Sequence, residues 1–258
     1  MPGRFLPGCA NCAPPGEFLE PTGADHIARR QAAEARVLMR CDPPLRTLVE
    51  GRLRAFAARQ AVRDLNHAAA VAVAICEEGH GADLPGFARH AEWSAQAALI
   101  LTRRAGHLRH HAGQWALPGG RIDAGETPEQ AALRELAEEV HLELDASAVM
   151  GRLDDFITRS GFVITPVVVW AGAARSLRPN PAEVASIHRI PIMEFLRADA
   201  PMLANEGHGE HPVLRMPVGS DGWIAAPTAA IVYQFREVCI EGRDTRVAHF
   251  EQPVFAWK

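Results

Sequence analysis

The sequence predicts an α/β protein in which helices pack on a mixed β-sheet. Short apolar runs typical of buried strands occur at residues 68–75, 97–102 and 162–170. Between the last two runs, residues 128–140 carry apolar side chains at helical spacing, with charged side chains on the opposite arc. Strands and helices do not alternate regularly, so we expect the sheet to combine parallel and antiparallel strands.

Two segments before the first strand predict helices. Residues 24–40 are rich in Ala and Arg, both strong helix formers. Asp42, followed by Pro43 and Pro44, stops that helix and caps a second, amphipathic helix that runs to about Phe56. We favour packing of this helix on the main domain over a dimer interface, and a homodimer stays open. The predicted organisation is a flexible tail at 1–22, a helical extension at 23–62 and a main domain at 63–258.

The main domain holds further elements on both sides of the 128–140 helix. Pro166 interrupts the run at 162–170, which predicts an edge strand or a bulge there. The other expected elements are a loop at 79–85, a short strand at 187–190, a helix at 226–238 and a last strand at 246–256.

Composition excludes several classes of protein. The 258 residues are 48% apolar, enough for a core without disulfide or metal staples. Lys plus Arg number 27 against 31 Asp plus Glu, so the net charge of −4 argues against a general nucleic-acid binder. Five cysteines are few and odd in number, which favours a reducing compartment. With no apolar stretch of membrane-spanning length, we expect a soluble cytoplasmic protein without nucleic-acid or membrane partners.

The 128–140 helix begins with a capping box and carries clustered carboxylates. Thr127 precedes Pro128, and Gln130 stands three residues after the cap. Glu135, Glu138 and Glu139 are three and four residues apart, so they are neighbours on the helix surface. Such like-charge pairs destabilise an isolated helix by about 0.2–0.5 kcal/mol each, so a positive partner is expected.

Two interpretations of these carboxylates remain open from the helix alone. One is a solvated acidic face with Arg134 and Arg121 as partial counterions. The other is a site for Mg²⁺ or Mn²⁺, because carboxylates on a rigid face beside the carbonyls of the Gly119–Gly120 loop are ligands that suit these ions.

The full spacing favours the metal site. Gly120, five residues, Glu126, seven residues and then Arg134-Glu135-Leu136-Ala137-Glu138-Glu139 resembles the Nudix box. One position departs from that pattern, since His141 stands where the family usually has the Gly that ends the helix. Histidine tolerates the left-handed conformation, so we expect His141 to cap the helix rather than bind metal.

The Nudix resemblance implies a fold and a chemistry. The implied fold is an α/β/α sandwich with a mixed sheet, here with an N-terminal helical extension, and the implied activity is divalent-metal-dependent hydrolysis of a diphosphate linked to a nucleoside. Glu135, Glu138 and Glu139 would hold Mg²⁺ or Mn²⁺ together with the Gly120 carbonyl, and Arg134 would orient the carboxylates. The general base varies in this family, and the downstream candidates are Glu183 and Glu206.

The segment upstream of the box resembles the additional signature of the Nudix coenzyme A pyrophosphatases. The matching positions are Leu101, Thr102, Arg104, Ala105, Leu108, Arg109, His111, Gly113, Pro118, Gly119 and Gly120. The resemblance implies cleavage of coenzyme A or its thioesters to 3′,5′-ADP and 4′-phosphopantetheine or an acyl derivative, with Arg104, Arg109 and Gly119 binding substrate. Residues 103–111 hold six arginine or histidine side chains, which suits the additional 3′-phosphate of coenzyme A.

Two other functions stay open. The chain could hydrolyse another nucleoside diphosphate derivative, such as ADP-ribose, NADH or a dinucleoside polyphosphate. It could also be a nucleotide-binding regulator on a Nudix scaffold, although the intact set of Glu135, Glu138 and Glu139 argues against a silenced enzyme.

Weaker patterns receive simpler interpretations. Cys9 and Cys12 lack a second ligand pair at zinc spacing, so we expect a tail dithiol rather than a metal site. His208 and His211 predict a polar loop rather than a second metal site. The tryptophans are expected in the core or at its edge, and among them only Trp115 is placed near the ligand.

Overall fold

The computed structural model describes residues 39–62, 67–205, 211–220 and 222–253, all within one compact unit at 38–258. The helices are α2 (Pro43–Ala55), α3 (Pro128–Val140) and α4 (Thr228–Phe235), with short 3-10 turns at Ala146–Ala148 and Ile192–Leu196 and a π-helical turn at Arg236–Glu241. The strands are β1 (Ala68–Gly79), β2 (Ser94–Arg104), β3 (Trp115–Ala116), β4 (Gly119–Arg121), β5 (Val149–Arg152), β6 (Phe156–Ile157), β7 (Val163–Gly172), β8 (Val184–Pro191), β9 (Met202–Ala204), β10 (Val213–Val218) and β11 (Gly222–Ala225). The expected tail, the Cys9–Cys12 pair, most of the first predicted helix, Glu206 and His208 lie outside the described residues.

The main sheet is mixed, as predicted. Its central path runs β3-β2-β1-β7-β5, with β8 along β2, β4 along β1 and β6 along β7. Strands β1 and β7 are parallel, whereas the other pairs in this sheet are antiparallel. A separate three-stranded sheet has the order β11-β10-β9.

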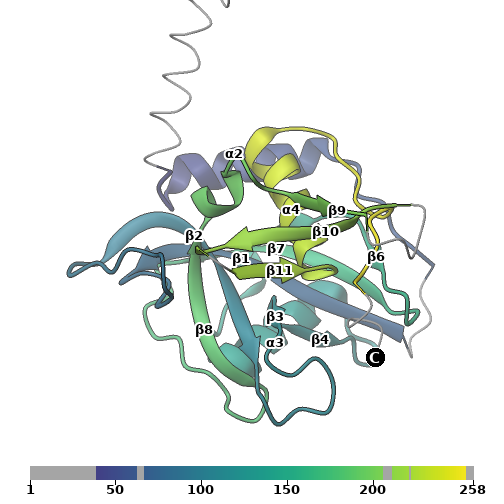
Figure 1. Ribbon diagram of the computed structural model, residues 1–258, viewed down its shortest axis with the longest axis horizontal. Coiled ribbons are helices and arrows are strands. Elements are labelled where there is room, and N and C mark those ends of the chain that lie inside the picture. Colours follow the sequence, from purple (N-terminus) through teal and green to yellow (C-terminus); the bar gives the residue numbers. More distant parts are fainter. Residues whose placement is uncertain (1–38, 63–66, 206–210, 221, 254–258) are drawn as a thin grey trace, which may run out of the picture. The chain divides into compact units, whose positions relative to one another are not determined.

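Strand β1 shows why helices cover both faces of this sheet. Successive side chains of a strand point to opposite faces, so its run of small and branched residues is divided between two cores. Ala70, Ala72 and Ala74 pack with α3, where their small side chains permit close approach of the helix. Val73 and Ile75 pack with residues of α2, α4 and β10 on the other face. The resulting α/β/α sandwich confirms the predicted fold class, and Figure 1 shows α3 and α2 on opposite sides of the strands.

Helix α2 packs on the main sheet. The Asp42 carboxylate accepts a hydrogen bond from the Leu45 N–H at 3.1 Å, so Asp42 is the predicted N-cap. Leu45, Val49 and Leu53 are buried in the core shared with the sheet and α4. The apolar stripe that the sequence predicted is thus buried within this chain, as favoured.

Pro166 does not mark an edge strand. Strand β7 has β1 on one side and both β5 and β6 on the other. Pro166 lies between the β6 pairing, which ends at Ile164, and the β5 pairing, which starts at Val167. Proline has no N–H to donate, so it is tolerated where the partner strand changes. The expectation of an edge was wrong because sequence could not show two short partner strands.

The last predicted strand is also wrong over the described residues 246–253. This segment forms turns, with an isolated bridge from Glu251 to Val213. Val247 is buried beside Ala230 of α4, and the Phe250 N–H donates to the Val247 carbonyl at 3.1 Å. Its apolar side chains are therefore buried by a turn against α4 rather than by strand pairing. In the part of the chain that the structure describes, no helix has the length and apolarity needed to cross a membrane.

Candidate active site

Both ends of α3 are fixed by local contacts. Thr127 Oγ1 accepts a hydrogen bond from the Gln130 N–H at 3.3 Å, and the Gln130 side chain accepts one from the Thr127 N–H at 2.8 Å, which confirms the capping box. His141 adopts the left-handed conformation (φ 55°, ψ 40°), and its N–H donates to the Leu136 carbonyl. A ring nitrogen of His141 lies 2.9 Å from the Arg178 carbonyl oxygen, so His141 closes the helix as expected.

The glycine loop fits against α3 without room for side chains. Strand β4 pairs with β1, and a Cβ on Gly119 would stand 2.4 Å from the Ala70 carbonyl oxygen. A Cβ on Gly120 would stand 2.1 Å from Glu135 Oε1. The Gly119 N–H donates to Glu139 Oε2 at 3.3 Å. Glycine at both positions therefore lets the loop backbone reach the helix carboxylates.

Arg134 joins three of the surrounding carboxylates. Its guanidinium lies 3.0 Å from Glu126 Oε1, 2.9 Å from Glu135 Oε1 and 3.1 Å from Glu138 Oε2. A further N–H donates to the Arg121 carbonyl oxygen at 2.9 Å. The hydrogen bond from Arg134 holds the pKa of Glu126 below its usual value. The contact that Arg121 makes with this group is through its carbonyl, while its guanidinium lies over the Phe162 ring.

Two of the helix carboxylates are buried close together. Glu139 is 3% exposed and Glu135 is 8% exposed, whereas Glu138 lies at the surface. Burial, followed by repulsion from Glu135 and Glu183, raises the pKa of Glu139 to about 8. Burial also raises the pKa of Glu135, and the charges of Glu138 and Glu183 act in the same direction. This site concentrates negative charge beyond what Arg134 neutralises.

The donor set fits a hard divalent cation. Among the described residues, no three His, Cys, Asp or Glu side chains converge as a complete metal cage. Mg²⁺ is usually held by one or two carboxylates, with water and substrate phosphates supplying the other oxygens. Buried Glu135 and Glu139, set against the Gly120 backbone, match that partial set, and a cation there would offset their repulsion.

A cleft of about 340 Å³ opens beside Gly120, and we call it the Gly120 cleft. Arg104 and Arg121 supply positive charge to its lining, and the Nε of Arg104 is buried without a hydrogen-bond partner. Arg104 also lowers the pKa of Glu139 electrostatically, although burial and the carboxylates outweigh it. Arg109 is different, because it lies exposed in the loop between Arg104 and Gln114 and does not line this cleft.

Sequence reasoning missed the far side of the Gly120 cleft. The additional lining residues are Thr158, Ser160, Phe162, Ile164, Pro227, Thr228 and Gln252. They come from three segments that follow the carboxylate helix. Residues 157–168 resemble the strand that follows the box in the coenzyme A pyrophosphatases, but no motif or spacing pointed to Pro227, Thr228 or Gln252. Only the packing of those segments around the sheet brings them to the site.

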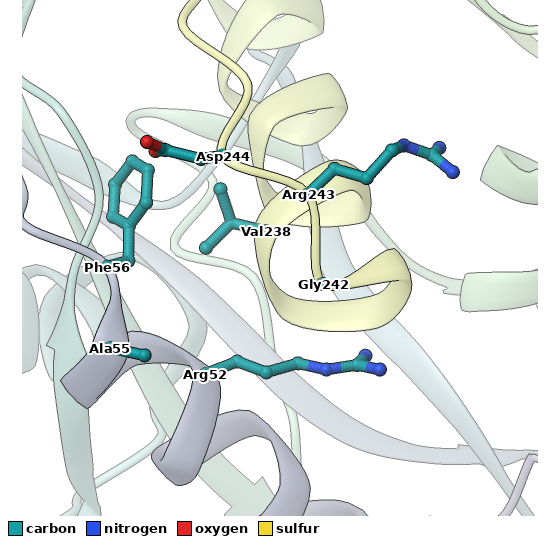
Figure 2. A pocket seen from close by; sticks show the side chains of 7 residues that line it. All are labelled: Arg52, Ala55, Phe56, Val238, Gly242, Arg243 and Asp244. Carbon is teal, nitrogen blue, oxygen red and sulfur yellow. The ribbon is translucent and has the colours of Figure 1, made fainter.

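A separate cavity of about 190 Å³ lies between α2 and the segment after α4. Figure 2 shows the Arg52 and Arg243 side chains extending to the same side of it, away from Phe56. Arg52 donates to the Cys239 carbonyl at 2.9 Å, and Arg243 pairs with Glu237 at 2.6 Å. Both arginines are engaged in structural contacts, so this cavity serves the packing of α2.

Known proteins resemble the part of the chain that contains the carboxylate helix. A family model described as NUDIX domain matches residues 90–209. The uncharacterized Nudix hydrolase NudL of Yersinia enterocolitica is 42% identical over 103 residues, which are 40% of this chain and 53% of that protein. Its counterpart in Photorhabdus laumondii is 43% identical over 99 residues, or 38% of this chain and 53% of the relative. The chain thus spans about half the length of these curated relatives.

Solved structures resemble the chain more distantly. A MutT/nudix family protein from Enterococcus faecalis superposes with a TM-score of 0.42 at 18% identity. That alignment covers 69% of this chain and 64% of the other.

Proposed function

Since residues 90–209 are a Nudix domain, we propose that the chain hydrolyses the diphosphate bond of a nucleoside diphosphate derivative with the aid of Mg²⁺ or Mn²⁺. The observation that carries this proposal is the contact of the Gly119–Gly120 backbone with buried Glu135 and Glu139. When bound, the divalent ion supplies charge neutralisation for the phosphate oxygens and a lower pKa for the attacking water.

The ion would be held by Glu135 and Glu139, with the Gly120 carbonyl and Glu138 as the further ligands that the Nudix box implies. Arg134 acts as a positioning residue, because it bonds Glu126, Glu135 and Glu138 at once. Its fixed fork orients carboxylates through several hydrogen bonds.

Glu183 acts as the general base. It lies close enough for its charge to raise the pKa of both Glu135 and Glu139. Its side chain is exposed, and the Ala105 N–H donates to its carbonyl at 2.8 Å, which fixes its backbone beside the end of β2. An ionised carboxylate at this position can accept a proton from water at the diphosphate.

Coenzyme A is the preferred substrate in this proposal. Arg104 offers an unpaired guanidinium nitrogen in the Gly120 cleft, which suits a phosphate oxygen. The upstream segment with Arg104, Arg109 and Gly119 resembles the coenzyme A pyrophosphatase signature. A second candidate is another nucleoside diphosphate derivative, since the carboxylate site would act on the diphosphate alone, which all these substrates share.

Product analysis tests this function. The purified chain is incubated with Mg²⁺ or Mn²⁺ and with coenzyme A, ADP-ribose, NADH or a diadenosine polyphosphate in parallel. Metal-dependent release of 3′,5′-ADP from coenzyme A, faster than cleavage of the others, is expected. Turnover of another substrate alone would overturn the coenzyme A assignment, and no turnover on the whole panel would overturn the hydrolase assignment.

A further inference from the structure

A second cleft of about 330 Å³ adjoins the Gly120 cleft. The two share lining residues Gln114, Trp115, Pro227 and Thr228. The second cleft is also lined by Arg103 and Trp223, and we call it the tryptophan cleft. Both volumes fall at the lower end of the range of about 300–1,000 Å³ for small-molecule sites. A ligand can therefore extend from one cleft into the other along a common wall.

Strand β2 supplies one arginine to each cleft. At the end of this strand, Arg104 lines the Gly120 cleft and its neighbour Arg103 lines the tryptophan cleft. Arg103 lies over the Trp115 ring at 4.0 Å and donates to the Gly113 carbonyl at 2.9 Å. Arg103 and Arg104 thus supply one positive charge to each of the two clefts.

Trp115 forms a fixed part of the shared wall. It is 7% exposed, and its ring meets His188 edge-on at 5.0 Å. His188 is itself held by hydrogen bonds at both ring nitrogens, to Ala82 at 2.8 Å and Ser186 at 2.7 Å. The indole Nε1 of Trp115 is buried without a hydrogen-bond partner. The common wall therefore combines a rigid aromatic surface with an unused donor.

Trp223 is the exposed aromatic group of the tryptophan cleft. It lies in β11, paired with Pro217 of β10, and Arg215 stacks on its ring at 4.7 Å. The residue remains 40% exposed. It belongs to a segment beyond the Nudix domain at 90–209, so this surface is an addition made by the C-terminal part of the chain.

We propose that the tryptophan cleft binds the nucleobase of the substrate by stacking on Trp223, while the diphosphate lies in the Gly120 cleft. This inference rests on the proposed function for the position of the diphosphate. An indole backed by a guanidinium offers a flat surface for a flat ring, and base stacking on aromatic side chains changes affinity by about 5- to 150-fold. Gln114, at the boundary, lies where a ribose or base edge would pass.

Binding of AMP and ribose 5-phosphate, measured by calorimetry with Mg²⁺ present, tests this subsite. AMP contains the base and is not a diphosphate, so it reports on the subsite without turnover. Trp223→Ala is expected to raise the Kd for AMP by about 5- to 150-fold and to leave that for ribose 5-phosphate unchanged. Trp223→Phe should keep most of the affinity. Leu203→Ala, at an exposed apolar side chain in the same small sheet, is the matched control and should change neither.

The outcomes separate this inference from the proposed function. Unchanged AMP affinity in Trp223→Ala, equal weakening of ribose 5-phosphate, or no AMP binding by the unaltered chain would overturn the nucleobase subsite. If the alanine variant does not fold, Trp223→Leu removes the π face while keeping apolar volume, and it has the same expected result. If the unaltered chain binds AMP but hydrolyses no substrate on the panel, and Trp223→Ala weakens AMP binding, the nucleobase subsite is supported and the hydrolase function is rejected.

Discussion

The two walls of the Gly120 cleft differ in how the chain builds them. One wall is the glycine loop, backed by α3 in a continuous stretch of chain: Gly120 lines the cleft and contacts Glu135 behind it, and Gly119 contacts Glu139. The opposite wall is assembled from distant segments, and it includes both Phe162 of the β6–β7 region and Thr228 at the start of α4. Local geometry thus places the groups proposed to hold the cation, and long-range packing places those proposed to select the substrate.

This contrast gives different expectations for the two walls. Changes in the α3 wall should slow hydrolysis of every diphosphate alike, because they act on groups common to the bond being broken. Changes in the opposite wall should alter affinity for particular substrates and leave the rate at saturation unchanged.

The largest effect is expected for Glu139→Gln. Glutamine keeps the shape and can still accept from the Gly119 N–H, but it loses the charge that would hold a cation. Loss of several kcal/mol of transition-state stabilisation corresponds to a fall in kcat of about 10³-fold or more. Circular dichroism and thermal melting should show an intact fold. Unchanged turnover would remove the helix carboxylates from the mechanism.

Glu183→Gln should lower kcat by about 10²-fold or more for all substrates, since a general base typically contributes 10²–10⁴-fold. KM should stay within a small factor. Steady-state kinetics on the preferred substrate measure both. Glu143→Gln, at an exposed carboxylate just after α3, is the matched control and should behave as the parent chain. Equal rates for the two variants would reject Glu183 as the base.

Gly120→Ala tests the close approach within the α3 wall. The new Cβ would stand 2.1 Å from Glu135 Oε1, so the carboxylate or the loop must shift. A misplacement of about 1 Å costs about 10²-fold in rate. Gly51→Ala in α2 meets no atom within 4 Å and should leave kcat unchanged. Full activity of the Gly120 variant would show that the contact is dispensable.

Arg109→Ala probes the exposed loop between Arg104 and Gln114. If this exposed loop contacts the 3′-phosphate in the complex, KM for coenzyme A should rise by about 10-fold, the value of a charge-assisted hydrogen bond. KM for dephospho-coenzyme A should change less. An equal loss for both substrates would place Arg109 away from the 3′-phosphate.

The smallest expected effect is on stability and concerns the ion pair that joins α3 to the sheet. Glu129, in the first turn of α3, pairs with Arg152 of β5 at 2.6 Å, and that hydrogen bond holds the pKa of Glu129 below its usual value. When the pKa of a carboxyl is lower in the folded state, the ion pair stabilises the protein at pH values above the unfolded pKa of about 4.3. This stabilisation decreases as the pH falls below that value.

Glu129→Gln should therefore lower the free energy of unfolding by about 0.5–1 kcal/mol at neutral pH, and the difference should decrease as the pH falls from about 4.3 through the lower folded-state pKa. Urea denaturation of both proteins across this range measures it. kcat should not change, because the pair lies outside the proposed catalytic groups. A difference that is independent of pH would contradict the ion-pair explanation.

Sequence reasoning was most successful where contacts are local. Thr127 and Gln130 were assigned their helix-start roles from spacing, and His141 was assigned its capping role from the place it takes in the Nudix pattern. The structure confirms these roles. Reasoning failed where a distant partner decides the outcome. Pro166 lies in an interior strand because two short strands share the position beside it.

The same distinction applies to the site. The loop and helix carboxylates are close in sequence, so their meeting follows from backbone geometry and the small size of glycine. Trp115 and Trp223 line the same cleft, but strands β4 to β10 lie between them in the sequence, and no periodicity relates the two.

By itself, the sequence determined the capped carboxylate helix, the glycine loop against it and the resemblance to a diphosphate-cleaving family. Those features depend on residues within a few turns of one another, where spacing fixes geometry. Tertiary structure alone decided the second wall, the exposed place of Arg109 and the joining of two clefts around Trp115. These depend on how buried apolar faces pack around the sheet, and such contacts are selected by the whole core rather than by any local pattern.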